Sequence, residues 1–316
     1  MSVLTYPEAI VIGALQGVTE LFPVSSLGHS VLLPAIVGGS WARDLNVSAP
    51  ESPYLAFIVG LHVATALALL LLFRRDWARI VKGFVTSIGH QSISTPDERL
   101  AWLVIIATVP VGLTGLLLEH TFRTTLGKPT PAAVFLTLNG VMLLLGEQLR
   151  RRRAGPATDL PPADLAPVLP PNEADDLPPN EADDLEVDHR LAELTWSRAF
   201  VTGASQSLAL LPGISRSGVT MLAGLAQGLT HEEAVRLSFL LATPVILAAG
   251  VLKVPDLSGH LGTGIHGQIL AGSLAAFGCA YLAARFLTRW FSTRTLTPFG
   301  IYCLLAGPIA LVLIHR

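Results

Sequence analysis

A polar element that interrupts an apolar stretch occurs twice in this chain. The first copy contains Gly13-Ala14-Leu15-Gln16 and Pro23-Val24-Ser25-Ser26-Leu27-Gly28-His29-Ser30, and the second contains Gly203-Ala204-Ser205-Gln206 and Pro212-Gly213-Ile214-Ser215-Arg216-Ser217-Gly218. The glycine, glutamine and serine positions match at one constant offset, and only the proline is displaced by a residue. Duplicated broken elements of this kind are typical of folds in which two related halves build one shared site.

The composition is that of a membrane protein. Hydrophobic residues make up 51% of the 316 residues and charged residues only 14%, whereas soluble domains carry roughly 25% charged residues. Cys279 and Cys303 both fall in apolar stretches and imply no disulfide framework. Six apolar segments approach the length of about 20 residues that crosses a bilayer as a helix: 53–73, 101–119, 131–149, 234–252, 267–287 and 297–314. We therefore predict an all-α polytopic membrane protein.

Segments 6–38 and 196–229 are also apolar, but Pro, Ser and Gly residues break each of them in the middle. Each half is roughly 10–15 residues long, which is too short to cross a bilayer. Irregular backbone at membrane depth is tolerated where it is buried in protein or lines a cavity. We therefore predict two re-entrant helix–loop–helix hairpins. The alternative is that each segment forms two ordinary kinked spans.

The order of elements predicts an inverted-topology repeat. Three spans follow each hairpin, so the second repeat (196–316) enters the membrane from the face opposite to the first repeat (1–149). This topology places most Lys and Arg residues on one side, including Arg74-Arg75 and Arg150 to Arg153. Because positive charge accumulates in cytoplasmic loops, we expect this side to be cytoplasmic, with both termini outside and the first hairpin open to the outer face.

Residues 150–195 join the two repeats. Within them, segment 154–188 is rich in proline and acidic residues and contains Pro-Pro-Asn-Glu-Ala-Asp-Asp-Leu twice in tandem, at 170–177 and 178–185. Such a composition offers too little apolar surface to fold. We predict a disordered cytoplasmic linker that acts as a spacer, with a role in binding a partner as the alternative.

Ionisable residues within the membrane are costly and mark candidate functional sites. Four stand out: Glu20 and His29 in the first hairpin, Arg216 in the second, and His62 in the first span. Gln16 lies one helical turn before Glu20, so the two side chains share a face of the first half-helix.

The residues around both breaks suit an anionic ligand. In the first hairpin, Ser25, Ser26, Gly28 and His29 lie in and just after the break, where backbone amides at a helix N-terminus form a ready anion site. In the second hairpin Ser215, Ser217 and Gly218 surround Arg216. A guanidinium fork beside hydroxyls and free amides recognises phosphate well.

Structural explanations exist for each residue taken alone. The four serines can be simple N-caps, His62 can be a satisfied core histidine, and Glu20 with Arg216 can form only a buried ion pair. The convergence of a His, a Glu and an Arg on two related breaks favours a functional site.

At these residues the chain resembles the bacitracin-resistance undecaprenyl-diphosphate phosphatase family. Gln16-x-x-x-Glu20 fits the family's Glu/Gln-x-x-x-Glu motif, Ser25-Ser26-x-Gly28-His29 fits its Ser-Ser-x-Gly-His motif, and Pro212-Gly213-x-Ser215-Arg216-Ser217-Gly218 fits its Pro-Gly-x-Ser-Arg-Ser-Gly motif. The resemblance covers the chain except the linker.

The resemblance implies an enzyme of the bacterial plasma membrane that dephosphorylates undecaprenyl diphosphate at the outer side. It recycles the lipid carrier for cell-wall synthesis and confers bacitracin resistance. A divalent cation (Mg or Ca), with Glu20 as its expected ligand, is expected to aid activity, and a homodimer is compatible with the resemblance. The sequence departs from the family where Leu27 replaces a usual threonine and Gln16 replaces a more common glutamate.

For a phosphatase, we assign Arg216, with Ser215 and Ser217, to the diphosphate and Ser26 to the nucleophile, with His29 as its general base. Alternatively, His29 and Glu20 activate a water directly. Glu20 with Gln16 then orients His29 or holds the cation. Two other functions remain open: a polyprenyl-phosphate flippase or anion transporter, which inverted repeats also serve, and a structural assembly subunit. A serine–histidine pair favours the enzyme over the carrier.

Overall fold

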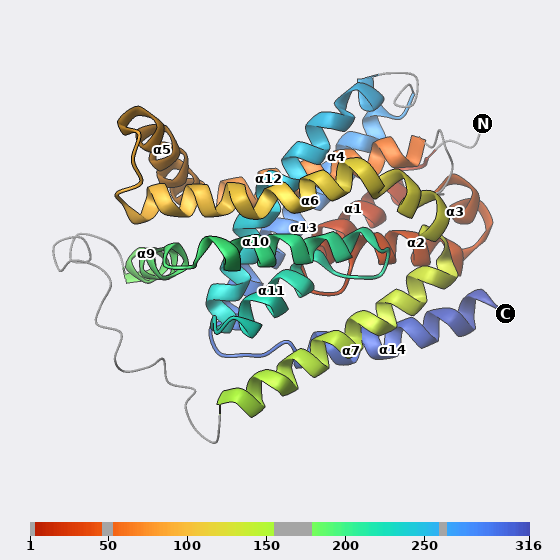
Figure 1. Ribbon diagram of the computed structural model, residues 1–316. Coiled ribbons are helices and arrows are strands. Elements are labelled where there is room, and N and C mark those ends of the chain that lie inside the picture. Colours follow the sequence, from red (N-terminus) through yellow and green to blue (C-terminus); the bar gives the residue numbers. More distant parts are fainter. Residues whose placement is uncertain (1–3, 46–52, 155–178, 259–263) are drawn as a thin grey trace.

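The computed structural model describes residues 4–45, 53–154, 179–258 and 264–316 (Figure 1). In these ranges the chain is helical, without a strand. The first repeat consists of α1 (Tyr6–Leu21), α2 (Ser26–Val37), α3 (Gly39–Asp44), α4 (Pro53–Leu72), α5 (Arg74–His90), α6 (Pro96–Leu126) and α7 (Pro129–Ala154). Helix α9 (Pro179–Ala192) lies in the segment that joins the repeats. The second repeat consists of α10 (Trp196–Ser205), the 3-10 helix η1 (Gln206–Leu210), α11 (Arg216–Ala226), α12 (His231–Ser258), α13 (His266–Phe291) and α14 (Thr297–Ile314).

The helices confirm the prediction of an all-α polytopic membrane protein. Among the described residues, α6, α7, α12, α13 and α14 contain stretches long and apolar enough to cross a membrane. The remaining predicted span, 53–73, corresponds to α4, which is followed by α5 after a bend of 88°. The sequence did not predict α5 as a separate helix, and Figure 1 shows it standing off the end of the bundle.

Both segments predicted as hairpins are pairs of short helices. In the first, α1 has 16 residues and α2 has 12, with a break at 22–25. In the second, α10 and η1 are followed by a break at 211–215 and then by α11, which has 11 residues. A helix of this length rises about 17–24 Å, less than the ~30 Å hydrocarbon core. These lengths agree with the predicted re-entrant hairpins.

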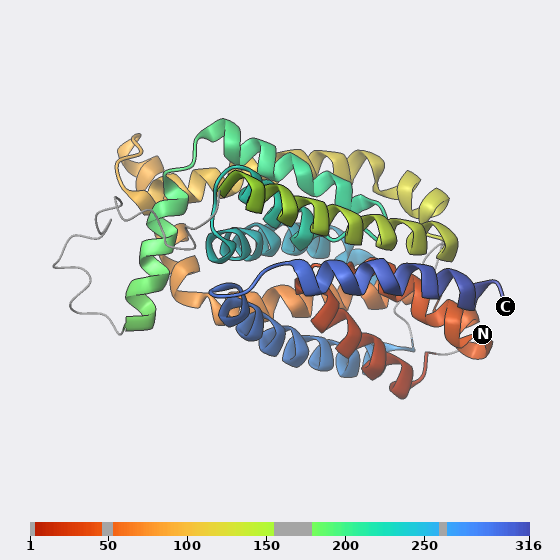
Figure 2. The ribbon, with the colours of Figure 1, turned by 90° about the horizontal axis from the view of Figure 1, so that it is seen from below.

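Each hairpin packs against a span of the other repeat. Helix α1 lies along α13, and α10 lies along α6. The matching glycines explain this close approach, because a Cβ at Gly13 would collide with the backbone of Gly272, and one at Gly203 with the backbone of Ala107. The repeats are further joined where α7 runs beside α14 (Figure 2). The two halves therefore interlock rather than sit as separate domains.

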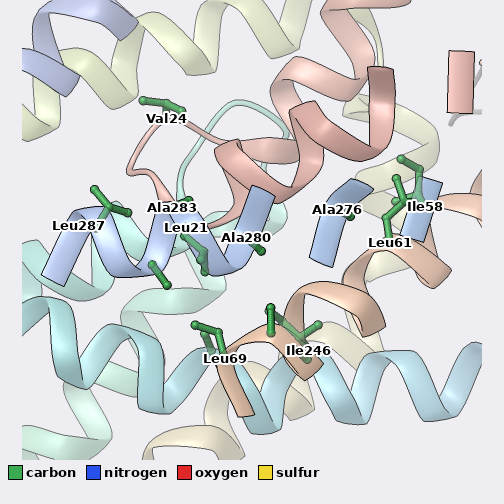
Figure 3. Packing of buried hydrophobic residues seen from close by; sticks show 14 of the residues in the cluster. Leu21, Val24, Ile58, Leu61, Leu69, Ile246, Ala276, Ala280, Ala283 and Leu287 are labelled. Atoms are coloured by element: carbon green, nitrogen blue, oxygen red, sulfur yellow. The ribbon is translucent and has the colours of Figure 1, made fainter. Parts of the chain in front are cut away.

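The main apolar core fills the space between α1, α4, α12 and α13 (Figure 3). Small residues on α13, Ala276, Ala280 and Ala283, let α1 approach closely, while Leu61 and Leu69 of α4 complete the packing. This core holds the end of α1, and with it the first break, at a fixed position inside the protein.

Part of the predicted disordered linker is folded, so that prediction was wrong for its last third. Residues 179–192 form α9, in which Asp188 is buried. Its carboxylate lies 2.7 Å from Arg79 Nη2 and 2.6 Å from Arg236 Nε. Val187 and Leu191 are buried beside it. The acidic composition predicted disorder because it does not show that Asp188 is neutralised by arginines that lie far away in the sequence. Residues 155–178, including the first tandem octapeptide, lie outside the described residues.

Candidate active site

The breaks of the two hairpins meet around the carboxylate of Glu20. Arg216 Nη2 donates to Glu20 Oε1 at 2.7 Å, although the residues are far apart in sequence. The hydroxyl of Ser26 donates to the other oxygen, Oε2, at 2.5 Å. Glu20 is only 7% exposed. One buried carboxylate therefore binds a hydroxyl from the first hairpin and a guanidinium from the second.

Local helix geometry explains how the first hairpin supplies these groups. Gln16 and Glu20 lie one turn apart near the end of α1, and Gln16 Nε2 donates to Glu20 Oε2 at 2.9 Å. The chain then turns, and α2 begins at Ser26 with Ser25 as its N-cap. Ser25 has a φ of 68°, a left-handed conformation that a non-glycine residue adopts at a cost of about 1–3 kcal/mol. This strained turn brings the Ser26 hydroxyl back towards α1.

Ser25 also joins the two hairpins. Its Oγ accepts from the amide of Gly28 at 3.2 Å within α2 and from the amide of Gly213 at 3.1 Å across the interface. A Cβ on Gly28 would lie 2.9 Å from the Cα of Gly213. A glycine is therefore needed here to let the two breaks approach each other.

The serines of the second hairpin bind the first hairpin directly. Ser215 caps α11 by accepting from Gly218 N at 3.1 Å, and its Oγ lies 3.0 Å from that of Ser217. Ser217 donates to the carbonyl of Phe22 at 3.2 Å. Both serines are 2% exposed. Their hydroxyls thus have protein partners, and the predicted role in substrate binding stays a prediction.

The described structure has no hydrogen bond between His29 and Ser26, the pair predicted as base and nucleophile. Its Nδ1 lies 2.7 Å from the carbonyl of Ser25, one turn back along α2, so the neutral ring donates from Nδ1. Its Nε2 lies 2.7 Å from the hydroxyl of Tyr302 on α14 and has acceptor character. The hydrogen-bond partner of Ser26 is instead Glu20. His29 keeps a basic nitrogen at the edge of the site, next to a half-exposed tyrosine.

Two buried polar atoms of the site have no partner among the described residues: Gln16 Oε1 and Arg216 Nη1. Buried polar atoms are normally paired, so each unpaired one calls for an explanation. Arg216 uses Nη2 for Glu20 and keeps Nη1 as a free donor, as a guanidinium needs when it also binds an anion.

Comparisons with known proteins find a matching family and close relatives of this chain. The family described as Bacitracin resistance protein BacA matches residues 9–309. A protein of Mycolicibacterium paratuberculosis named "Undecaprenyl-diphosphatase" is 64% identical over 98% of this chain and 97% of its own length. One of Frankia casuarinae named "Undecaprenyl-diphosphatase 1" is 52% identical over 99% of both chains. Chromobacterium violaceum has one named "Undecaprenyl-diphosphatase 2", 42% identical over 96% of this chain and 97% of its own.

The chain belongs to the BacA family.

Two residues that the sequence analysis did not predict, Asn139 and Tyr302, complete the site of this family member. Asn139, in the middle of α7, is fully buried and bridges the two breaks. Its Nδ2 donates to the carbonyl of Pro23 at 3.0 Å, and its Oδ1 accepts from the amide of Ser215 at 3.0 Å. A lone asparagine within a predicted span was the available signal, since polar residues at membrane depth are rare. Tyr302, the partner of His29, gave no comparable signal.

His62 lies in the Glu20 network instead of being an isolated core histidine. Its Nε2 is 3.2 Å from Gln16 Nε2 and 3.4 Å from Glu20 Oε2. Its Nδ1 lies 2.8 Å from the carbonyl of Ile58, which fixes the ring orientation. The neutral ring accepts from Gln16, whereas a ring that has gained a proton can donate to Glu20. His62 therefore helps to fix the positions of the Gln16 and Glu20 side chains.

The described donor set does not fit a divalent cation bound by the protein alone. Among the described residues no group of three or more His, Cys, Asp or Glu is arranged to hold a metal. Both oxygens of Glu20 are used, one by Arg216 and the other by Ser26 and Gln16. Mg²⁺ and Ca²⁺ need several oxygen ligands. The cation stays a prediction, and the proposed reaction uses only residues of this chain.

Proposed function

We propose that this protein hydrolyses undecaprenyl diphosphate to undecaprenyl phosphate and inorganic phosphate. The names of its relatives at up to 64% identity support the substrate. The observation that carries the chemistry is the shared carboxylate: Glu20 binds the Ser26 hydroxyl on one oxygen and the Arg216 guanidinium on the other. This arrangement brings a nucleophile, a proton acceptor and a phosphate-binding cation together.

Substrate binding is assigned to Arg216 and to the two half-helices. Ser26 and Arg216 are the first residues of α2 and α11, so the positive ends of two helix dipoles lie at the site. The free Nη1 of Arg216 donates to the terminal phosphate. When the guanidinium turns to the phosphate, the Glu20 carboxylate is released from its ion pair and becomes available to accept a proton.

In the first chemical step, Ser26 Oγ attacks the terminal phosphorus. The bond from that phosphorus to the bridging oxygen breaks, and its electron pair leaves with undecaprenyl phosphate. The Ser26 proton passes to Glu20 Oε2, which lies 2.5 Å from the hydroxyl. Arg216 stabilises the charge on the equatorial oxygens, as guanidinium groups do in phosphoryl transfer.

In the second step, water hydrolyses the phosphoserine. Water attacks phosphorus, the bond to Ser26 Oγ breaks, and Glu20 returns its proton to the serine. We assign the acceptance of the water proton to His29 Nε2, whose Nδ1 is held by the carbonyl of Ser25. His29 then loses this proton to bulk water as phosphate leaves, which restores the starting state. His29 therefore acts in the second step, after Ser26 has attacked phosphorus in the first.

We also propose that the site opens to the outer face and that the linker is cytoplasmic. The support is the concentration of arginines at Arg74-Arg75 and Arg150 to Arg153, which positive charge in cytoplasmic loops explains. The alternative, a flippase or anion transporter, is not favoured, because a carrier has no use for a hydroxyl placed on a buried carboxylate.

Phosphate release from undecaprenyl diphosphate by the purified protein in detergent tests the proposed function. The wild type is expected to release one phosphate per lipid, and Ser26→Ala to lose nearly all turnover. Ser207→Ala is the matched control, since Ser207 lies in the second hairpin and bonds only to Thr114 on α6. No phosphate release by the wild type, with transport of the lipid between leaflets in vesicles, would refute the proposal in favour of a carrier.

A further inference from the structure

A surface cavity lined by cationic and apolar side chains lies at the C-terminal end of α13. Its volume is about 460 Å³, and its lining includes Arg285, Arg289, Arg294, Trp290, Phe286 and Leu282. The three arginines are exposed, and the guanidinium of Arg294 lies over the ring of Trp290, 5.8 Å from its centre. No residue of the proposed reaction lines this cavity.

The charge of this cavity is not neutralised within the part of the chain that the structure describes. None of its three guanidinium groups has a carboxylate partner there, whereas other arginines of the protein do. Arg236 contacts Asp184 and Asp188, and Arg150 contacts Glu147. A helix C-terminus carries only about half a negative charge, which three arginines outweigh. The cavity therefore attracts an anion.

The position of the cavity indicates where that anion comes from. Helix α13 is one of the candidate spans, 266–291, and the arginines occupy its last turns and the residues just beyond. Leu282 lies one turn before Arg285, towards the middle of the span, and is 66% exposed, while Phe286, between Arg285 and Arg289, is 47% exposed. Apolar side chains, three arginines and Trp290 thus share the last turns of a candidate span and the residues just beyond, as at a membrane–water interface, where tryptophan and cationic side chains are enriched.

We propose that this cavity binds an anionic phospholipid, with its phosphate on the three arginines and its acyl chains along Leu282 and Phe286. Basic pockets at the ends of membrane helices bind such headgroups. The site is distinct from the diphosphate site, because Glu20, Ser26, His29 and Arg216 do not line the cavity. The two sites are connected, since the Phe286 ring stacks on that of Phe22 at the first break, 5.9 Å between centres. Bound lipid would hold Phe286 against the hairpin.

Native mass spectrometry of the detergent-solubilised protein tests the proposal, with phosphatidylglycerol and phosphatidylcholine as probes. The wild type should retain phosphatidylglycerol in preference to phosphatidylcholine. The triple variant Arg285→Gln, Arg289→Gln, Arg294→Gln should bind phosphatidylglycerol roughly a hundredfold more weakly, because each basic residue at the surface contributes about 1 kcal/mol. Arg74→Gln, Arg152→Gln, Arg198→Gln is the matched control, since these arginines are also exposed and the charge distribution places them on the same membrane side.

Three outcomes would overturn the proposal: affinity of the cavity variant within threefold of the wild type, an equal loss in the control variant, or displacement of the lipid by millimolar inorganic phosphate, which would indicate a site for a free anion. A lysine triple at the same positions covers the case of a misfolded glutamine variant. It keeps the charge and should retain phosphatidylglycerol binding within about tenfold, because lysine also binds phosphate as a point charge. Loss of binding in a folded lysine variant, judged by its unfolding temperature, would contradict the role of charge.

Discussion

The two hairpins are built alike but contribute opposite chemistry. Ser26 and Arg216 are equivalent positions, each the first residue of the second half-helix, and Ser25 and Ser215 are the equivalent N-caps. The first hairpin places a hydroxyl at this position and the second a guanidinium, and both bind Glu20. The duplication therefore supplies two helix N-termini that face one point, and different residues at the matched positions supply different chemical groups.

The hairpins differ further at the end of their first half-helices. Gln16 bonds to Glu20 and contacts His62. Its counterpart Gln206 is equally buried, yet neither polar atom of its side chain has a partner among the described residues. The position equivalent to Glu20 holds Leu210, at the end of η1. The acid therefore belongs to one hairpin only, which makes the site asymmetric.

The largest expected effect comes from removing the contribution of the second hairpin. Arg216→Ala should lower kcat by about a thousandfold or more, because one donor to a developing oxyanion is worth roughly 10²–10³ and the charge is lost as well. Arg216→Lys should not restore activity, since a lysine lacks the bidentate fork. Phosphate release measures both. Arg198→Ala, an exposed arginine on α10, is the control, and near-normal turnover by the lysine variant would reduce Arg216 to a counter-ion.

The next effect concerns the connection between the hairpins. Asn139→Leu leaves the carbonyl of Pro23 and the amide of Ser215 without their partner, and an unsatisfied buried group costs about 1–3 kcal/mol. The free energy of unfolding in detergent should fall by about 2–4 kcal/mol, together with activity. Thr137→Val removes a hydroxyl bonded only within α7 and should cost less than about 1 kcal/mol. Equal losses in both variants would show that Asn139 does not join the breaks.

The sequence was sufficient to locate the hairpins and to assign Glu20 and Arg216 to one site, because ionisable residues in apolar segments and duplicated Pro, Ser and Gly breaks can be recognised without a structure. It could not assign the partner of Ser26. On sequence spacing alone His29 looked like its base, but in α2 the imidazole turns back to the carbonyl of Ser25. Helix α9 was missed because its buried Asp188 depends on Arg79 and Arg236, which only the fold brings close.

A smaller effect is expected from shortening the connection between the repeats. Deleting 156–178 should leave activity and unfolding temperature close to normal. The proline-rich, acidic composition of this segment predicts disorder, and the cost of closing a disordered loop depends only logarithmically on its length. A deletion extended to residue 188 removes Asp188 and leaves Arg79 and Arg236 with Asp76 as their shared buried partner. It should destabilise the protein by about 1.5–3 kcal/mol, the usual contribution of a hydrogen bond to a charged group. Thermal unfolding in detergent compares the two. Equal stability would contradict the role assigned to α9.

The smallest effect is expected at Leu27, whose counterpart in the second hairpin is Ser217. The hydroxyl of Ser217 donates a hydrogen bond to the carbonyl of Phe22, whereas the partly buried Leu27 packs against the core. Leu27→Thr gives the first hairpin a hydroxyl at the matching position and should change kcat/KM by no more than a few-fold in either direction. Steady-state phosphate release measures this ratio, and a marked loss would mean that the pocket depends on the leucine side chain.

The most direct test of the account is a double-mutant comparison around Ser26, in which kcat for phosphate release is measured for Ser26→Ala, Glu20→Gln, His29→Ala and the two double variants that contain Ser26→Ala. Residues that act as one unit give non-additive losses. The account predicts that Ser26→Ala and Glu20→Gln each nearly abolish turnover and that their combination is little worse than either alone. His29→Ala alone should accumulate phosphorylated protein with undecaprenyl diphosphate, because the first step proceeds without it. Substantial turnover by Ser26→Ala, with none by His29→Ala and no phosphorylated protein, would contradict the account and assign the attack to a water activated by His29.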